Sequence, residues 1–273
     1  MTSMKIKSLI RNISKEKNVN PQIVLRNYML ERLLERISKS EYKYNFVLKG
    51  GMLVASIVGL DSRATIDLDA TLKNFPLSRE KIEKAFEDIL QVDVNDDINI
   101  KLLNITEIRE DADYHGFRLS FIGVIDESRI PLKVDITTGD KITPNAVTYS
   151  FKLLLEDRNI EVMAYNIETI LAEKFETIIS RATVNTRMRD FYDIYILTKF
   201  QSKNINLDLF KQALDATSKG RGSRNKINNS KNILDDIKNS KKLKKLWENY
   251  IVKNPYAKGI DWDSIIEAVY YLL

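Results

Sequence analysis

Two aspartates one residue apart, Asp67 and Asp69, are the first side chains whose type and spacing suggest chemistry. In an extended segment, residues two apart point to the same face, and Asp is depleted in strands. Asp135 has a comparable place on the polar face of 130–137, where apolar and polar residues alternate. Mg²⁺ prefers oxygen ligands and usually takes one or two carboxylates plus substrate phosphates. The pattern favours a metal site at these three carboxylates over the alternative, which is a set of exposed strand residues.

A turn upstream of the aspartates is suited to phosphate. Lys49, Gly50 and Gly51 separate a short apolar run from a longer apolar segment. Such a strand–turn–helix leaves backbone N–H groups at a helix start, where an anion can bind. The segment 66–72 is predicted to be the next strand, with Ile66 facing the core. A phosphate cradle beside paired carboxylates predicts a site for a nucleotide and its metal ions.

The order of the elements predicts an α+β fold. Strand patterns dominate 98–165 and include a hairpin whose connection spans 110–116, whereas helical spacing prevails from residue 167 onward. We expect an α+β lobe with flanking helices over 1–165, followed by a helical lobe over 166–273.

Two polar segments invite simple interpretations. The basic, glycine-containing segment 218–232 is predicted to be a loop. The helix predicted to end near Lys39 has a charged face that we interpret as solvated. The members of that face are Arg26, Glu31, Arg32, Glu35 and Arg36.

The helical half contains a second set of candidates. Lys174 lies in a mostly apolar helix, and Asp190 and Asp193 lie near the start of the next one. Lys174 can be a snorkelling surface lysine, and the two aspartates can pair with Arg187 and Arg189 at a solvated helix start. The residues alone therefore assign no chemistry here.

Composition sets further limits. The chain has 273 residues, no cysteine and one histidine, which excludes disulfides, thiol catalysis and multi-histidine metal sites. It shows no secretory signal and no membrane-length apolar run, so we expect a cytoplasmic protein. The net charge is +5, and ten Lys or Arg residues fall within 219–245. Such a tract suggests a polyanion partner or a solvated face.

The segment LKGGMLVASIVGLDSRATIDLDATL resembles the first motif of the AbiEii-type nucleotidyltransferases, the toxin arm of AbiE abortive-infection toxin–antitoxin systems. These enzymes belong to the DNA polymerase β-like superfamily, so the resemblance implies a nucleotidyltransferase-like mixed-sheet lobe over 1–165. The first motif is matched by Gly50, Gly51, Arg63, Asp67 and Asp69. A later signature, a helix with a central Lys followed by Arg-Asp-x-x-Asp, is matched by Lys174, Arg189, Asp190 and Asp193. The second glycine departs from the serine of the stricter superfamily motif.

The resemblance implies an activity. It implies a Mg²⁺- or Mn²⁺-dependent nucleotidyltransferase that moves NMP from an NTP, with GTP or a pyrimidine NTP as candidates, to an acceptor hydroxyl. The implied acceptor is the 3′ end of a tRNA, whose modification inhibits growth in defence against phage. The cognate antitoxin is expected to be a winged-helix regulator that acts without stable contact. NMP transfer to a protein hydroxyl and a non-catalytic nucleotide or nucleic-acid binding module are the alternatives.

The resemblance also implies roles for individual residues. Metal binding is implied for Asp67, Asp69 and Asp135. Contact with the donor nucleotide is implied for Lys49, Gly50, Gly51, Arg63 and Lys133. Lys174 would reach the triphosphate, and Asp190 or Asp193 would orient that site, so that the helical lobe contributes the second half of the active site. The tract 219–245 would bind the tRNA.

Overall fold

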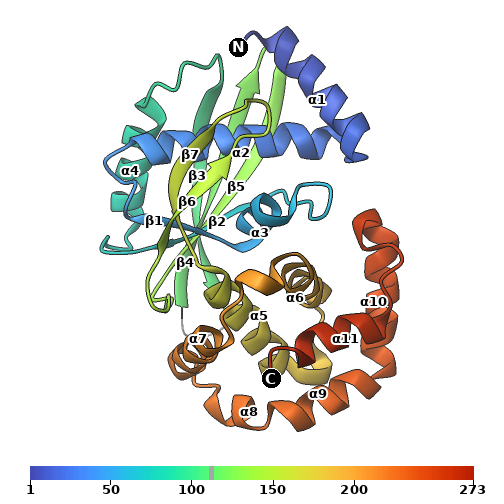
Figure 1. The fold of residues 1–273 in the computed structure, drawn as a ribbon. Helices are drawn as coiled ribbons and strands as arrows, with labels where there is room; N and C mark the ends of the chain where they lie inside the picture. The colour runs from blue at the N-terminus through green and yellow to red at the C-terminus, as the bar shows by residue number, and fades with distance from the viewer. Residues whose placement is uncertain (111–113) are drawn as a thin grey trace. The chain divides into compact units, whose positions relative to one another are not determined.

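The computed structural model describes residues 1–110 and 114–273. The chain divides into two compact units (Figure 1). The first consists of Met1–Gly139 and Ala146–Ala164, and the second of Asp140–Asn145 and Tyr165–Leu273. The first unit contains a mixed sheet with helices, and the described part of the second is helical, so the predicted α+β class is confirmed.

The described residues of the first unit form a seven-stranded sheet in the order β3-β4-β5-β2-β1-β7-β6. Pairing is parallel between β2 and β5 and between β1 and β7, and antiparallel elsewhere. The strands are β1 (Phe46–Lys49), β2 (Leu68–Leu72), β3 (Asn99–Glu110), β4 (Tyr114–Ile125), β5 (Ser128–Thr138), β6 (Val147–Lys152) and β7 (Asn159–Ala164). The predicted connection over 110–116 includes 111–113, which lie outside the described residues.

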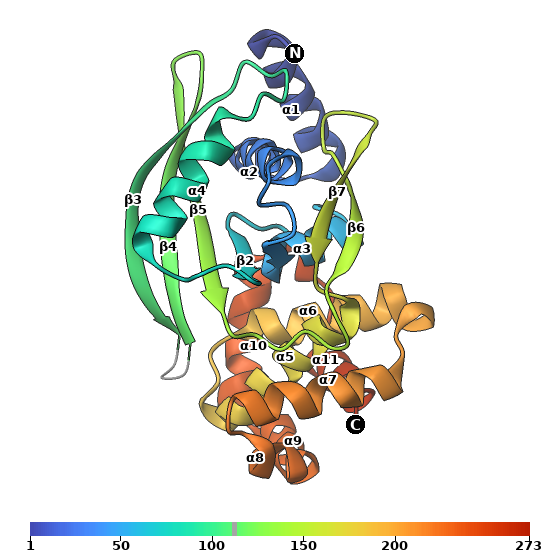
Figure 2. The same cartoon turned by 90° about the vertical axis from the view of Figure 1, so that its left-hand side faces the viewer.

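The helices of this unit are α1 (Ser3–Lys17), α2 (Pro21–Lys39), α3 (Gly50–Val58) and α4 (Arg79–Gln91). The α2 helix begins where Asn20 accepts a hydrogen bond from the Gln22 N–H and Pro21 occupies the first helical position. It packs against β5 and β7, while α4 packs against β3 and α2 (Figure 2). The helices thus cover one sheet face with apolar side chains.

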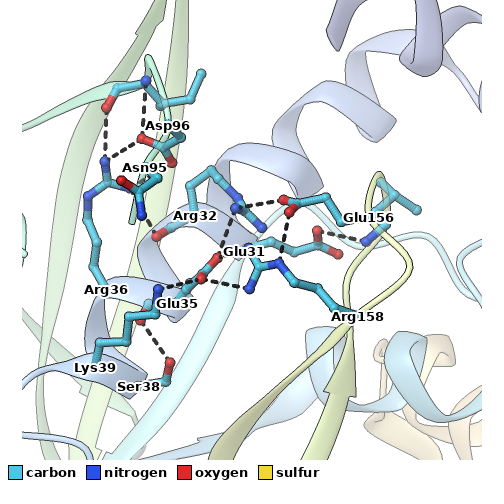
Figure 3. Close-up of polar contacts among 12 residues, drawn as sticks. Glu31, Arg32, Glu35, Arg36, Ser38, Lys39, Asn95, Asp96, Glu156 and Arg158 are labelled. Carbon is cyan, nitrogen blue, oxygen red and sulfur yellow. Dashed lines mark hydrogen bonds and ion pairs between the residues drawn. The ribbon is translucent and has the colours of Figure 1, made fainter. Parts of the chain in front are cut away.

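Four members of the charged face of α2 are buried, so the solvated interpretation is wrong for them (Figure 3). They are Glu31, Arg32, Glu35 and Arg36, whereas Arg26 is half-buried. Glu35 has no exposed surface and pairs with Arg32 and Arg158 at 2.8 Å each. Glu31 accepts a hydrogen bond from the Leu154 N–H at 3.0 Å, and burial raises its pKa to about 8. The β6–β7 connection supplies Leu154, Arg158 and Glu156, the second partner of Arg32. Helical periodicity could not reveal a covering segment more than a hundred residues away.

The observed strand begins two residues later than the predicted strand 66–72. β2 starts at Leu68, and Ile66, predicted to face the core, has 39% of its surface exposed. Thr71, by contrast, is buried and donates a hydrogen bond to the Thr137 carbonyl. Because β2 is a central strand, Thr71 is buried although it lies at a polar position of the alternation, which sequence alternation alone does not show.

The second unit contains α5 (Ile167–Arg181), α6 (Met188–Gln201), α7 (Leu207–Gly220), α8 (Arg224–Asn228), α9 (Ser230–Asn239), α10 (Lys241–Lys253) and α11 (Trp262–Tyr270). Short 3₁₀ turns cover Ala182–Val184, Ser202–Asn204 and Pro255–Ala257. Among the described helices of both units, none combines the length and apolarity that a membrane span requires.

The predicted loop 218–232 is mostly helical, so that prediction is wrong. Arg221 pairs with Glu176 of α5 at 2.7 Å, and Lys226 donates to the Ser180 carbonyl at the end of α5. These contacts hold the α7–α8 junction against α5. Tertiary hydrogen bonds therefore override the weak helix propensity of this Gly-, Ser- and Asn-rich segment.

Candidate active site

Two of the predicted metal ligands lie side by side in the sheet. Asp69 on β2 is the register partner of Asp135 on the parallel strand β5. On its other side, Asp69 is paired in register with Lys49 of β1. Register partners on neighbouring strands direct their side chains to the same face of a sheet, both in the parallel β2–β5 pair and in the antiparallel β1–β2 pair. The structure therefore brings the two carboxylates and the lysine together.

Asp69 is partly exposed and lies among other carboxylates that disfavour its negative charge. Desolvation raises its pKa to about 6, and the neighbouring charges of Asp135 and Asp67 add to the rise. Lys49 and a hydrogen bond from the Gly51 N–H act in the opposite direction. Asp67 directly precedes β2 and joins the same cluster electrostatically. The three carboxylates therefore repel one another, which is the situation that a bound cation relieves.

The Gly-Gly turn lies directly against Asp69. Gly50 has a φ of +67°, and a Cβ built on it would lie 2.0 Å from Asp69 Oδ2. The Gly51 N–H donates to the same oxygen across 3.4 Å. A side chain at position 50 is thus excluded twice, by the left-handed backbone and by the carboxylate.

The predicted phosphate contacts differ in their surroundings. Arg63 is buried, with 1% exposure, and donates to the Ala64 carbonyl. Its guanidinium lies beside Gly51, where a Cβ would be 3.2 Å from Arg63 Nη2. Lys133 is exposed on β5, two residues before Asp135 on the same face. The phosphate roles of Arg63 and Lys133 stay predictions.

Sequence reasoning missed Arg118. Its Nε and Nη2 atoms donate to the two oxygens of Asp135 at 2.8 and 2.7 Å. The pair follows from register, because Arg118 on β4 lies opposite Asp135 on β5. The carboxylate raises the pKa of Arg118 further above its usual value. Strand alternation in 117–125 could have placed Arg118 on a face, but only the hairpin register identifies its partner.

The carboxylate cluster has the right donor atoms for a divalent cation, but its side chains are not arranged around one. Asp67, Asp69 and Asp135 offer the hard oxygen donors that Mg²⁺ or Mn²⁺ takes. Among residues 1–110 and 114–273, however, no group of three acidic, His or Cys side chains is arranged to hold a metal ion. Arg118 engages both oxygens of Asp135 instead. The carboxylate oxygens therefore fit such a cation chemically, and in this structure the positive charge beside Asp135 comes from Arg118.

The second unit contains the other predicted cluster. Lys174 Nζ lies 2.6 Å from Asp193 Oδ2 and 3.3 Å from Asp190 Oδ1, joining α5 to α6. Asp190 also pairs with Arg187 at 2.8 Å, whereas Arg189 is exposed. The side chain of Lys174 is 12% exposed and that of Asp193 is fully buried, so the snorkelling-lysine and solvated-helix interpretations are wrong. Each unit thus carries one cluster, and their union into a single site stays a prediction.

Comparisons with known proteins give the chain a family. A model of the nucleotidyl transferase AbiEii toxin, type IV toxin–antitoxin system, matches residues 32–268. A candidate nucleotidyltransferase of Helicobacter pylori is similar in structure, with 16% identity and a TM-score of 0.52, over 93% of this chain and 96% of that one. MenT4, a nucleotidyltransferase toxin of Mycobacterium tuberculosis H37Rv, shows 15% identity and a TM-score of 0.52 over 76% of this chain and 68% of its own. No match is found among curated proteins.

At these identities the solved structures bear on the fold alone, and they confirm a nucleotidyltransferase fold. The family model spans both units and includes both clusters. The resemblance to the AbiEii family is therefore confirmed, and the chain belongs to the AbiEii family of nucleotidyltransferase toxins from type IV toxin–antitoxin systems.

Proposed function

We propose that this toxin is a divalent-cation-dependent enzyme that transfers NMP from an NTP to the 3′ end of a tRNA and thereby inhibits growth. One observation carries the proposal: Asp69 and Asp135 are register partners on parallel strands, and the Gly50–Gly51 turn lies directly against Asp69. Carboxylates that repel one another beside a turn without side chains suit a cation and the phosphates that it binds.

Each cluster has its own part in this reaction. Asp67, Asp69 and Asp135 hold Mg²⁺ or Mn²⁺, which when bound neutralises phosphate charge. Gly50 leaves room for the donor beside Asp69. In the second unit, two carboxylates fix the position of the Lys174 ammonium, which serves as a point charge for the triphosphate. Asp193 orients this lysine, because it makes the shorter contact and is fully buried.

The basic tract 219–245 is the proposed tRNA-binding surface. Its members are not equivalent, because Arg221 and Arg224 are paired with Glu176 and Asp215. The exposed lysines of the tract include Lys219, Lys231 and Lys238. Four more lie at the start of α10, namely Lys241, Lys242, Lys244 and Lys245, of which Lys245 pairs with Glu248 at 3.1 Å. These supply the salt-sensitive attraction to phosphate that nucleic-acid binding requires. The densest group of exposed lysines in the proposed surface is therefore at the start of α10.

Family membership implies an antitoxin partner. We propose that this antitoxin is a winged-helix regulator that opposes the toxin without stable contact. The proposal predicts that the two proteins elute separately in size-exclusion chromatography, and co-elution would contradict it.

Labelled NTPs test the activity. The protein is incubated with each α-labelled NTP, Mg²⁺ and total cellular RNA, and label is followed into RNA and protein. We expect label at tRNA 3′ ends with one preferred donor. Label in protein alone would replace tRNA with a protein hydroxyl as acceptor, and no label with any donor would favour a non-catalytic binding module.

Asp69→Asn tests the mechanism against a matched control. The substitution preserves shape and removes one of three mutually repelling charges, so we expect transfer and growth inhibition to be lost while thermal stability is kept or raised. Asp157→Asn changes an aspartate whose side chain is 99% exposed in the same unit, and it should leave transfer unchanged. A folded Asp69→Asn protein that still stops growth would contradict the catalytic mechanism.

A further inference from the structure

We infer that Arg118 is an internal counter-cation that competes with the divalent metal for Asp135. The inference rests on the metal dependence in the proposed function and adds a positioning residue to it. Its starting point is the two-pronged contact in which Arg118 Nε and Nη2 reach both oxygens of Asp135, at 2.8 and 2.7 Å. A planar fork of this kind covers the edge on which a cation would bind both oxygens.

The two partners differ in their freedom to move. The side chain of Asp135 is 15% exposed, on a strand paired on both sides, by β2 and β4. The side chain of Arg118 is 42% exposed. The carboxylate is therefore a fixed ligand, whereas the guanidinium has solvent into which it can withdraw. Exchange of the arginine for a metal ion needs a side-chain rotation only, with no rearrangement of the sheet.

Charge explains why such a partner is present. Asp69 is the register partner of Asp135, which lies opposite Arg118, and Asp67 lies two residues before Asp69. Lys49 is the register partner of Asp69 on the other side. Without metal, Arg118 offsets repulsion that would otherwise disfavour the folded arrangement. With metal, the same guanidinium repels the incoming cation.

The competition predicts opposite effects on two measurable properties. In Arg118→Gln, Mn²⁺ should bind about fivefold more tightly or better, because a competing charge is gone. The metal-free protein should unfold at a lower temperature, and Mn²⁺ should raise that temperature more than it does in the parent. Arg118→Lys, which retains charge without the two-pronged geometry, should lie between the two proteins.

Direct Mn²⁺ titration of the full chain, followed by electron paramagnetic resonance, supplies the readout without reliance on turnover. Arg129→Gln is the matched control: it removes the same charge from an exposed position on β5, about 20 Å along the strand from Asp135 at 3.3 Å per residue. It should leave Mn²⁺ affinity unchanged.

A double-mutant cycle separates direct competition from a general charge effect. In an Asp135→Asn background, Arg118 has lost its charged partner, so Arg118→Gln should no longer tighten Mn²⁺ binding. An equal gain in both backgrounds, or unchanged affinity in Arg118→Gln, would overturn the inference while leaving the proposed function intact. Failure of the parent protein to bind Mn²⁺ would overturn the inference together with the metal dependence on which it rests.

Discussion

The close approach of Gly50 to Asp69 gives the sharpest test of how this site is built. Gly50→Ala introduces a methyl group at a residue with a φ of +67°, where its Cβ would lie 2.0 Å from Asp69 Oδ2. Gly259→Ala introduces the same group at a φ of +84° with nothing within 4 Å. The two substitutions therefore share the backbone strain, and only the first one meets the carboxylate.

The expected magnitudes differ accordingly. A left-handed alanine costs about 1–2 kcal/mol of folding free energy, and both variants should lose that amount. Ordinary contact begins at 3.4 Å, so relief of the 2.0 Å contact at Gly50 displaces Asp69 Oδ2 or the turn by about 1.4 Å. Because a misplacement of about 1 Å can cost on the order of 100-fold in rate, Gly50→Ala should lose at least that factor in NMP transfer.

Two assays decide the outcome. Urea unfolding measures the stability loss of each variant, and single-turnover NMP transfer is then measured where both are fully folded. Gly259→Ala should transfer at the parental rate despite its lower stability. Equal stability losses together with a Gly50→Ala rate within twofold of the parent would refute the idea that the turn must approach Asp69 without a side chain.

Two further predictions address other parts of the molecule. Burial raises the pKa of Glu31 from 4.5 to about 8, so the folded protein holds a proton that the unfolded chain has lost, and stability falls as pH rises from about 4.5 to 8. Urea unfolding at pH 5 and pH 8.5 should show that Glu31→Gln removes this loss of stability, which is worth up to about 5 kcal/mol at about 1.4 kcal/mol per pKa unit. The substitution Glu127→Gln at an exposed position should leave the loss unchanged. An equal pH dependence of stability in both variants would contradict the assignment to Glu31. Filter-binding titrations at increasing salt should show a shallower salt dependence of tRNA binding when four α10 lysines become glutamine, and an unchanged slope would make the tract a plain solvated face. The four are Lys241, Lys242, Lys244 and Lys245.

Local patterns were enough to predict the class of fold and where the carboxylates lie. Period-two alternation placed Asp135 on the polar face of a strand, and the structure puts that strand next to the one carrying Asp69. The Gly-Gly break predicted the start of a helix, and α3 begins at Gly50. These successes share a cause, because each depends on a spacing of a few residues that local geometry fixes.

The failures have the opposite cause. Glu31 and Arg32 follow an amphipathic pattern typical of a solvated face, yet Leu154 and Glu156 cover them from the β6–β7 connection. Burying such charges is costly unless they are paired, so the partners decide whether the pattern means surface or interior. Those partners are set by strand order, which no spacing within α2 contains.

The same reasoning explains why Arg118 escaped prediction although Asp135 did not. A carboxylate on a strand is recognised as a candidate metal ligand from its residue type alone. The role of Arg118 on the neighbouring strand, by contrast, depends on the register that places it opposite Asp135. A register shift of one residue would turn the guanidinium to the other face of the sheet and leave Asp135 without it. The charge balance of the candidate site is therefore set by the β4–β5 pairing as much as by its acidic residues.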